Sequence, residues 1–408
     1  MKYEVLSKFY YKDKEKYEYE YHQRINSLSS IMLGIDINGY EAFVVTIPEL
    51  INLIENIYSL NFKLDKLYKD LPGVARECYR RNCIIDEIML TNDIEGVYST
   101  RKEITDVFDS KTNDKQLRFH GLVNKYKILN DNEMAEIPLF KSEDIRNLYD
   151  EIVLNEINKN DWPDGVMFRK SKVSVISATQ KEKHVGLLPE EKIVLYMDKA
   201  LDLLNNDNIS KMIRISVFHY LIGYIHPFYD GNGRLSRFIS SFLISKELCP
   251  LVSYRLSYAI KTNKELYYKI FDICNDKKNK GDVTPFVITF LKFIINSIEN
   301  LYEKVSNGYE ALDYLNDILN IVYSDDNREE KSMKYILFYL IQNELFDTES
   351  FDRNRLEEIS DYSYQTITKI IDKLISSGAP ITTEKEGKKI KYKLDMDTIE
   401  DFLMSKAE

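Results

Sequence analysis

The sequence predicts a mainly α-helical protein with a few short β-strands and a distinct C-terminal domain. Apolar residues recur at helical spacing over most of the 408 residues, which is typical of amphipathic helices around a shared core. Alternating, β-prone runs are confined to residues 41–47, 168–188 and 381–394. A charged break at residues 325–330 precedes a change of pattern, so we place a linker there.

Four segments are expected from these breaks. They are an N-terminal extension of short strands and a helix, a long helical region, a connecting helix with the linker, and a C-terminal domain, over residues 1–72, 73–305, 306–330 and 331–408. A chain of this length is long enough for two or three domains with substantial cores.

Composition limits the classes of function and the compartment. The net charge of −10 gives no global basic field for nucleic acid or membrane. Residues 1–21 lack the apolar core of a signal peptide, and no apolar run is long enough to span a bilayer. The four cysteines form no CxxC pair, which argues against zinc and disulfides; they are Cys78, Cys83, Cys249 and Cys274. We therefore expect a cytoplasmic protein without membrane association.

One segment, residues 226–237, gathers the chemistry expected of a polyphosphate site. Gly231 and Gly233 free the backbone to turn its N–H groups into one concavity, which binds anions. A helix is predicted directly after this turn, so its positive end adds to the attraction. Arg234 and Arg237 would share a face of that helix and offer forked donors to phosphate oxygens.

Two further side chains of this segment supply acid–base and metal chemistry. His226 is the group here that can take up a proton near neutral pH. Asp230 beside an anion-binding turn is explained by a divalent cation between its carboxylate and phosphate. The alternative interpretation is a buried helix-turn-helix junction whose polar residues only cap helices.

Residues 226–237 resemble the signature of Fic-family enzymes, written HPF-x-[DE]-GNG-R-xx-R, and every fixed position is matched. Members of this family mostly transfer AMP from ATP to a hydroxyl group of a target protein, with magnesium. The resemblance implies that His226 deprotonates the target hydroxyl and that Asp230 holds Mg²⁺. It also implies an ATP-binding stretch in which Arg237 meets the γ-phosphate, made of Asp230, Gly231, Asn232, Gly233, Arg234, Leu235, Ser236 and Arg237.

A second motif lies far upstream of the signature. Residues 74–92 are predicted to form a helix that Gly96 ends. A carboxylate at the negative end of this helix, Glu95, is either solvated or in need of a partner. The segment resembles the inhibitory motif of the Fic family, [ST]-xxx-E-[GN], with Thr91, Glu95 and Gly96 in register. That resemblance implies that Glu95 pairs with Arg237 and keeps the γ-phosphate out of its productive position.

The stretch after Pro250 contains two adjacent tyrosines, Tyr267 and Tyr268, for which one core ring and one surface ring are expected. In Fic enzymes the matching stretch closes over the base of ATP, so the resemblance implies that Tyr268 packs on adenine and Asn275 hydrogen-bonds it. Apolar pockets with a few directed polar groups are how proteins usually hold nucleobases. The alternative for each residue is an ordinary place in the core.

Two β-prone runs flank a polar turn at residues 179–183 and predict a β-hairpin. An exposed strand edge can bind a target segment in extended form and present its hydroxyl to a site. In the Fic family this hairpin is the flap that docks the target. The paired prolines usual after it are replaced here by Gly-Leu-Leu-Pro at residues 186–189, which leaves the identity of the target open.

Residues 331–396 follow the order helix, turn, helix and hairpin, which is typical of a winged helix-turn-helix. Such modules most often bind DNA, but this one has eleven basic and eleven acidic residues. A neutral domain gains little from neutralising phosphates, so protein recognition or homodimerisation is favoured over DNA binding. The basic residues that a DNA-binding wing would use are Lys385, Lys388, Lys389, Lys391 and Lys393.

Together these features predict a mainly α Fic helical bundle with a small β-hairpin flap, followed by a C-terminal winged helix-turn-helix domain. The expected function is an autoinhibited protein adenylyltransferase that uses ATP and Mg²⁺ to modify a Tyr, Thr or Ser hydroxyl of a target protein. Self-modification and the reverse removal of AMP are expected as further activities. Two alternatives are a winged-helix transcriptional regulator and a Fic relative that transfers a different phosphate-containing group. The intact His226 and Asp230 argue against the first, and the full signature favours AMP over the second.

Overall fold

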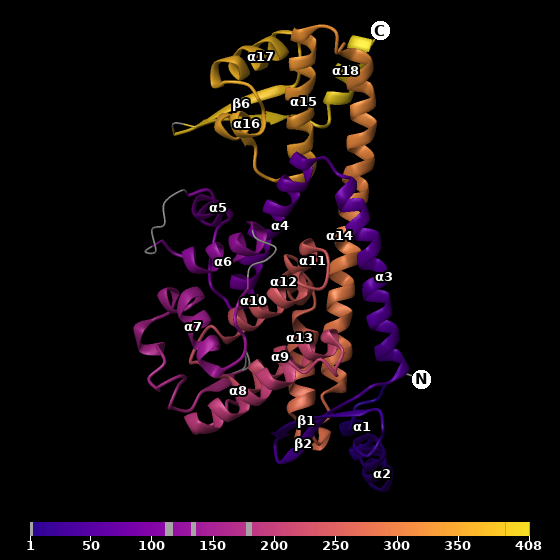
Figure 1. Cartoon of the computed structure of the whole chain (residues 1–408), viewed down its shortest axis with the longest axis vertical. Helices are drawn as coiled ribbons and strands as arrows, with labels where there is room; N and C mark the ends of the chain where they lie inside the picture. Colours follow the sequence, from indigo (N-terminus) through magenta and orange to yellow (C-terminus); the bar gives the residue numbers. More distant parts are fainter. Residues whose placement is uncertain (1–2, 111–116, 132–135, 177–181, 388, 408) are drawn as a thin grey trace. The chain divides into compact units, whose positions relative to one another are not determined.

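Helices make up most of the structure, a computed structural model that describes residues 3–110, 117–131, 136–176, 182–387 and 389–407 (Figure 1). Contacts divide the chain into two compact units, Met1–Phe62 with Ile85–Glu299 and Lys63–Ile84 with Asn300–Glu408. The division cuts through three long helices, α3 (Pro48–Asp70), α4 (Gly73–Ile94) and α14 (Thr284–Val322). The domain boundaries expected from the sequence, after residues 72, 305 and 330, were placed at breaks in the sequence pattern. Apolar periodicity does not show where one continuous helix passes from one core to another.

The first unit begins with two helices and a β-hairpin. These are α1 (Leu6–Lys12), α2 (Lys14–Ile25), β1 (Ser30–Ile37) and β2 (Tyr40–Val45). The register runs from Ser30 opposite Val45 to Ile37 opposite Tyr40, and both residues of the Asn38-Gly39 turn have positive φ. That conformation suits the twist of a two-residue hairpin turn. The main chain of Phe43 in β2 also bonds to Gly281 and Val283, at 3.0 and 2.9 Å, which ties the hairpin to the start of α14.

A bundle of helices follows and surrounds α9 (Lys211–Ile225), which packs against its neighbours on both sides in the sequence. Thirteen of the fifteen residues of α9 are buried, as expected for a helix that is apolar on every face. The other helices of this unit are α5 (Arg101–Asp109), α6 (His120–Asp131), α7 (Ser142–Ile152), α8 (Glu190–Leu204), α10 (Asn232–Ser245), α11 (Pro250–Ser253), α12 (Leu256–Thr262) and α13 (Lys264–Asn275). Three short 3-10 turns join them, η1 (Leu154–Glu156), η2 (Lys159–Asp161) and η3 (Lys277–Asn279).

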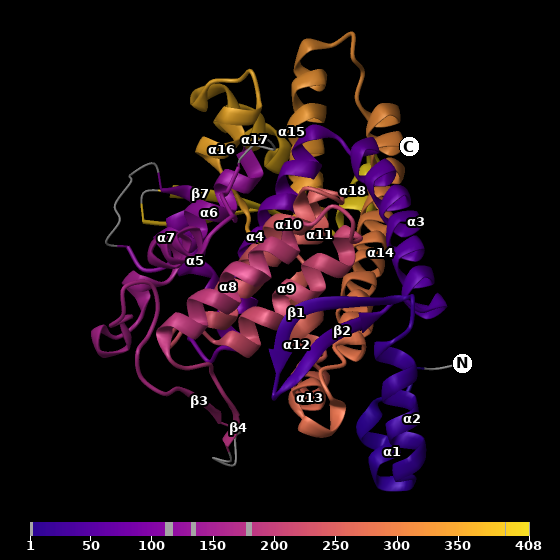
Figure 2. The same ribbon diagram turned by 60° about the horizontal axis from the view of Figure 1, so that its bottom comes forward.

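The β-hairpin predicted before α8 is present. Strands β3 (Ser174–Ile176) and β4 (Glu182–Val185) pair antiparallel, with Ser174 opposite Val185 and Val175 opposite His184. Figure 2 shows this hairpin extending away from the helices of the bundle. Most of the polar turn expected at residues 179–183 lies outside the described part of the chain, which omits residues 177–181.

The second unit contains the C-terminal helices and a three-stranded antiparallel sheet in the order β5-β7-β6. Its elements are α15 (Arg328–Phe346), β5 (Phe351–Asp352), α16 (Arg353–Ile359), α17 (Tyr364–Ser376), β6 (Ile381–Glu386), β7 (Lys389–Leu394) and α18 (Ile399–Ala407). The order helix, turn, helix and hairpin agrees with the sequence pattern, and Gly378 with φ 93° ends α17 as expected. A winged-helix function for this unit stays a prediction. In both units, the helices that are described include none with the length and apolar character needed to cross a membrane.

Candidate active site

The catalytic loop begins where α9 ends, at His226. This residue has the left-handed conformation (φ 51°, ψ 64°), and its N–H donates to the carbonyl of Ile222 at 2.9 Å. A residue other than glycine at positive φ is uncommon, and such strain is often found at functional sites. Phe228 anchors the loop, because its fully buried ring stacks on Tyr149 with 3.6 Å between centroids.

An amide clamp fixes the turn into α10. The side chain of Asn232 accepts from the Phe228 N–H at 3.0 Å and donates to the Phe228 carbonyl at 2.8 Å. Gly231 has φ 79°, and a Cβ there would lie 2.3 Å from Val153 Cγ1. Asn232 was expected to line an anion site; because its side-chain atoms hold the turn, its direct contribution there would come from its main-chain N–H.

The first turn of α10 receives a carboxylate from another helix. α10 has no side-chain cap at its N-terminus, where unpaired N–H groups attract anions. A Cβ added to Gly233 would lie 2.1 Å from Glu95 Oε1. Glycine at this position therefore allows the Glu95 carboxylate to approach the backbone of the helix start, where the sequence predicts phosphate.

The ion pair expected between Glu95 and Arg237 is present. Glu95 Oε1 lies 2.8 Å from Arg237 Nη2, and the arginine side chain is 1 % exposed. Thr91 holds the same guanidinium, with its hydroxyl accepting from Nε at 2.7 Å and its carbonyl from Nη2 at 3.1 Å. Burial alone would lower the pKa of Arg237, but the charge of Glu95 raises it above the ordinary value. Thr91 in the last turn of α4 and Glu95 just after it thus occupy Nε and Nη2 of this arginine.

The other signature arginine has a partner that the sequence did not indicate. Arg234 Nη1 lies 2.8 Å from Glu156 Oε2, and both side chains are buried. Burial raises the pKa of Glu156 to about 7, although the charge of Arg234 opposes the shift. Two guanidinium nitrogens of Arg234, Nε and Nη2, are buried without a hydrogen-bond partner in the described part of the chain. They are available to an anion at the start of α10.

His226 has the protonation state that a general base needs. Burial first, then the positive charges of His184 and Arg169, lower its pKa to about 4, while the Glu95 carboxylate opposes the shift. At pH 7 the imidazole is therefore neutral and able to accept a proton. The low pKa limits the strength of the His226 imidazole as a base. A bound polyphosphate would offset this limit, because its negative charge favours the imidazolium form and raises the pKa.

Asp230 is the candidate metal ligand. Its side chain is about half exposed, Oδ1 accepts from the Gly231 N–H at 2.5 Å, and Oδ2 lies 3.7 Å from Arg234 Nη2. The described residues include no group of three or more His, Cys, Asp or Glu side chains arranged to hold a metal. A single open carboxylate fits magnesium that is held mainly by substrate phosphates and water.

The residues expected near adenine lie on α13. Tyr267 is 5 % exposed and Tyr268 is 40 % exposed, so one ring is in the core and one at the surface, as predicted. Burial, then the Glu95 charge, raise the pKa of Tyr268, so this ring lies within electrostatic range of the Glu95 carboxylate. The side-chain oxygen of Asn275 accepts from the Tyr220 hydroxyl at 2.7 Å. Its amide nitrogen is the group left for a base, and both adenine contacts stay predictions.

Two signature positions have their polar groups engaged within α10. The Leu235 side chain is fully buried, and its N–H donates to the Gly231 carbonyl at 3.0 Å. The Ser236 hydroxyl donates to the Gly233 carbonyl at 3.2 Å. The expected contribution of these two residues to ATP binding is a prediction that rests on the signature and not on a visible contact.

Comparison with known proteins agrees with this geometry. Residues 139–244 match the profile of the Fic/DOC family. "Protein adenylyltransferase Fic" of Drosophila virilis is 24 % identical over 250 residues, which cover 60 % of this chain and 46 % of that protein. The protein of the same name from Drosophila willistoni is 32 % identical over 127 residues, covering 30 % of this chain and 22 % of the relative. The chain therefore spans less than half the length of these curated relatives.

A solved structure shares the fold. A Fic family protein from Desulfovibrio desulfuricans has a TM-score of 0.52 and 18 % sequence identity, with 86 % of this chain and 97 % of that chain covered. The profile covers the elements that place His226, Asp230 and Arg237 together, from α7 to the end of α10. Residues 139–244, which include the whole signature, therefore carry a domain of the Fic/DOC family.

Proposed function

We propose that this protein is an autoinhibited protein adenylyltransferase that transfers AMP from ATP to a hydroxyl side chain. The observation that carries the proposal is that one arginine, Arg237, binds the Glu95 carboxylate with donors that could also bind a phosphate. Arg237 is buried in α10, a helix whose start has no side-chain cap, and its Nη2 is occupied by the carboxylate of Glu95. The same carboxylate acts electrostatically on His226, whose ring is neutral at pH 7. A site that binds one anion there through an internal carboxylate has the donors to bind a phosphate.

In the proposed reaction one bond forms, one bond breaks, and each residue of the site has a separate role. The target hydroxyl oxygen forms a bond to the α-phosphorus of ATP, and the bond from that phosphorus to the β-phosphate oxygen breaks, which releases pyrophosphate. His226 takes the hydroxyl proton, a contribution typically of about 10²–10⁴-fold. The N–H groups at the start of α10 and the free nitrogens of Arg234 hold phosphate oxygens. When bound, Mg²⁺ on Asp230 and the phosphates would neutralise part of their charge.

Glu95 is proposed to limit this reaction. Because its carboxylate takes Arg237 Nη2 and lies against Gly233, a γ-phosphate has to displace it or adopt another position. We propose that the same carboxylate orients a water for the reverse removal of AMP. We expect the β3–β4 hairpin to dock the target segment, and the chain's own hydroxyl groups to be modified when inhibition is lifted.

The proposal is tested by comparing α-labelled with γ-labelled ATP. Wild type, Glu95→Gly and His226→Ala are incubated with Mg²⁺ and each nucleotide, and label on protein is measured. Only α-label should be transferred, most by Glu95→Gly and none by His226→Ala. Asp93→Gly is the matched control, because Asp93 lies two residues before Glu95, in the last turn of α4, but pairs with Lys261 at the surface. Transfer of γ-label would instead assign the site to phosphate transfer.

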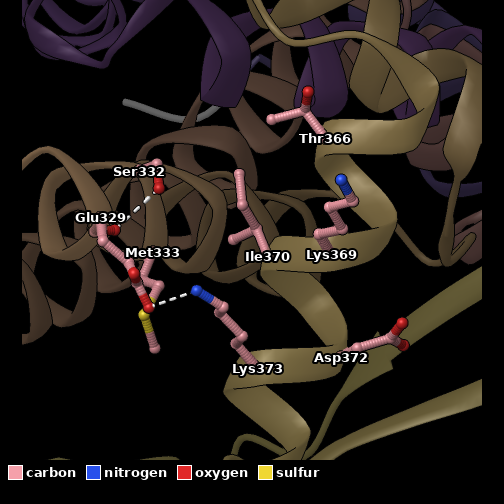
Figure 3. A pocket seen from close by; sticks show the side chains of 8 residues that line it. All are labelled: Glu329, Ser332, Met333, Thr366, Lys369, Ile370, Asp372 and Lys373. Atoms are coloured by element: carbon pink, nitrogen blue, oxygen red, sulfur yellow. Dashed lines mark hydrogen bonds and ion pairs between the residues drawn. The ribbon is translucent and has the colours of Figure 1, made fainter.

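The second unit is proposed to recognise protein, and a role as a DNA-binding transcriptional regulator is not favoured. Three of the basic side chains of α17 and the wing pair with carboxylates, in Lys373–Glu329, Lys389–Asp352 and Lys391–Glu349, at 2.6, 3.4 and 3.5 Å. Of the other wing lysines, Lys385 and Lys393 are not among these pairs, and Lys388 lies outside the described residues. A cavity of about 290 Å³ is lined by residues of α15 and α17. Figure 3 shows two of these residues, Lys373 and Glu329, paired with each other. Paired charges of both signs do not form the basic surface that duplex DNA requires.

A further inference from the structure

A buried cation contacts the main chain of His226. The Arg169 side chain is fully buried. Within the described part of the chain its hydrogen bonds all go to main-chain carbonyls, from Nε to His226 at 2.9 Å, from Nη1 to Ser171 at 2.7 Å and from Nη2 to Leu187 at 3.0 Å. Burial lowers the pKa of Arg169, and the Tyr229 hydroxyl and the Asp164 carboxylate oppose that shift without being among its hydrogen-bond partners. Holding a buried cation by carbonyls is costly, which points to a role in fixing those carbonyls in place.

The first of these bonds holds the strained residue of the site. The carbonyl of His226 accepts from Arg169, and the N–H of Arg169 in turn donates to the next carbonyl, that of Pro227, at 3.2 Å. Arg169 therefore hydrogen-bonds two consecutive carbonyl groups of the loop that follows α9. Because His226 is in the left-handed conformation, which is unfavourable by about 1–2 kcal/mol for an L-residue, an external hold on its carbonyl is needed to keep it there.

The other two bonds reach both ends of the β3–β4 hairpin. Ser171 precedes β3 and Leu187 follows β4, so the guanidinium joins the two legs of the hairpin at their base. Gly186 permits this arrangement, because a Cβ there would lie 2.2 Å from Arg169 Nη2 and 3.0 Å from His226 Cβ. The base of the hairpin and the catalytic loop thus meet at one side chain.

We propose that Arg169 is a positioning residue for adenylyl transfer, which sets the hairpin and the His226 peptide at a fixed separation. A hydroxyl presented by a segment docked on the hairpin then meets the imidazole at a defined distance, on which transfer depends strongly. This inference rests on the proposed function. Lysine retains the charge but lacks the planar fork that reaches three carbonyls, so Arg169→Lys removes the geometry and keeps the cation.

The test compares Arg169→Lys with its parent in a Glu95→Gly background, where transfer is not inhibited. Arg146→Lys is the matched control, because Arg146 also donates to a carbonyl of the same segment, that of Met167 at 3.0 Å, without contacting His226. The measurements are kcat for AMP transfer, the Kd for ATP by calorimetry, and hydrogen–deuterium exchange over peptides that cover the chain. Exchange reports the hairpin and loop whether or not AMP is transferred.

We expect Arg169→Lys to lower kcat at least tenfold with the Kd for ATP within twofold, and to speed exchange only in residues 171–187 and 225–229. Arg146→Lys should match its parent. A kcat within twofold of the parent, or faster exchange throughout the helices, would overturn the proposal. If the Glu95→Gly parent itself transfers no AMP, the proposed function fails, and local exchange alone then decides whether Arg169 positions the loop and hairpin.

Discussion

Replacing Glu95 with glycine should activate the protein while making it less stable. At 2.8 Å, and with an effective dielectric constant of about 20, the attraction between Glu95 and Arg237 is on the order of 6 kcal/mol before desolvation. Removing Glu95 leaves Arg237 buried with Thr91 and Tyr267 as neutral partners, which should lower the free energy of unfolding of the ligand-free protein by about 3 kcal/mol. A γ-phosphate that takes the vacated donors restores the charge balance. Activity and stability should therefore change in opposite directions.

The assay measures AMP transfer and thermal unfolding in a double-mutant cycle. Glu95→Gly should raise transfer at least tenfold, equivalent to about 1.4 kcal/mol, whereas Arg237→Ala should not, because it also removes the phosphate ligand. The double variant should stay nearly inactive, a clear departure from additivity. Asp93→Gly controls for the loss of helix propensity and should leave transfer unchanged. Equal transfer and equal ATP affinity in wild type and Glu95→Gly would refute the inhibitory role of Glu95.

Three further predictions concern the base, a buried acid and the C-terminal unit. His226→Ala should abolish transfer with ATP binding retained, and histidine NMR of the ligand-free protein should show His226 titrating near pH 4; a midpoint near 6.5 would mean that the ring is not buried as described. Burial raises the pKa of Glu87 from 4.5 to about 7, so the folded state binds this proton more tightly than the unfolded chain. The free energy of unfolding should therefore fall by at most ~3 kcal/mol as the pH rises from 4.5 to about 7. Glu87→Gln should weaken this dependence of stability on pH. If denaturant titrations show the same fall in stability with pH for the variant and for wild type, the prediction is wrong. The isolated protein should not retard duplex DNA even at low salt; salt-dependent binding that Lys389→Glu weakens would restore the regulator hypothesis.

Local patterns carried much of the fold. The helix predicted over residues 74–92, the glycine that ends it and the β-hairpin before α8 all appear where the sequence predicts them. In the C-terminal unit, glycines at helix and hairpin ends made the boundaries readable. These features depend on residues close in the chain. The N-terminal helices α1 and α2 were not predicted, because Tyr17 is the only buried residue of α2 and their stability comes from packing on distant segments.

The residues of the site likewise fall into those that local sequence motifs predicted and those that only the tertiary structure revealed. The signature run and the Glu95 motif are continuous stretches, so their resemblance to a family could be recognised. Glu156 and Arg169 lie elsewhere in the sequence, and each looks like an ordinary polar residue of a loop. Their roles come from burial beside Arg234 and His226, which only the tertiary structure provides. A signal that could have found Arg169 is an arginine directly after Phe168 in a β-prone run, where a buried position is otherwise expected to be apolar.

The most direct test of the central claim is the position of the γ-phosphate in crystals of wild type and Glu95→Gly, each with Mg²⁺ and a nonhydrolysable ATP analogue. The claim is that Glu95 and the γ-phosphate compete for Arg237. In Glu95→Gly, a γ-phosphate oxygen should lie within ~3 Å of an Arg237 nitrogen. In wild type, the ion pair to Glu95 should persist and the γ-phosphate should lie elsewhere. The same phosphate position in both proteins would contradict the account.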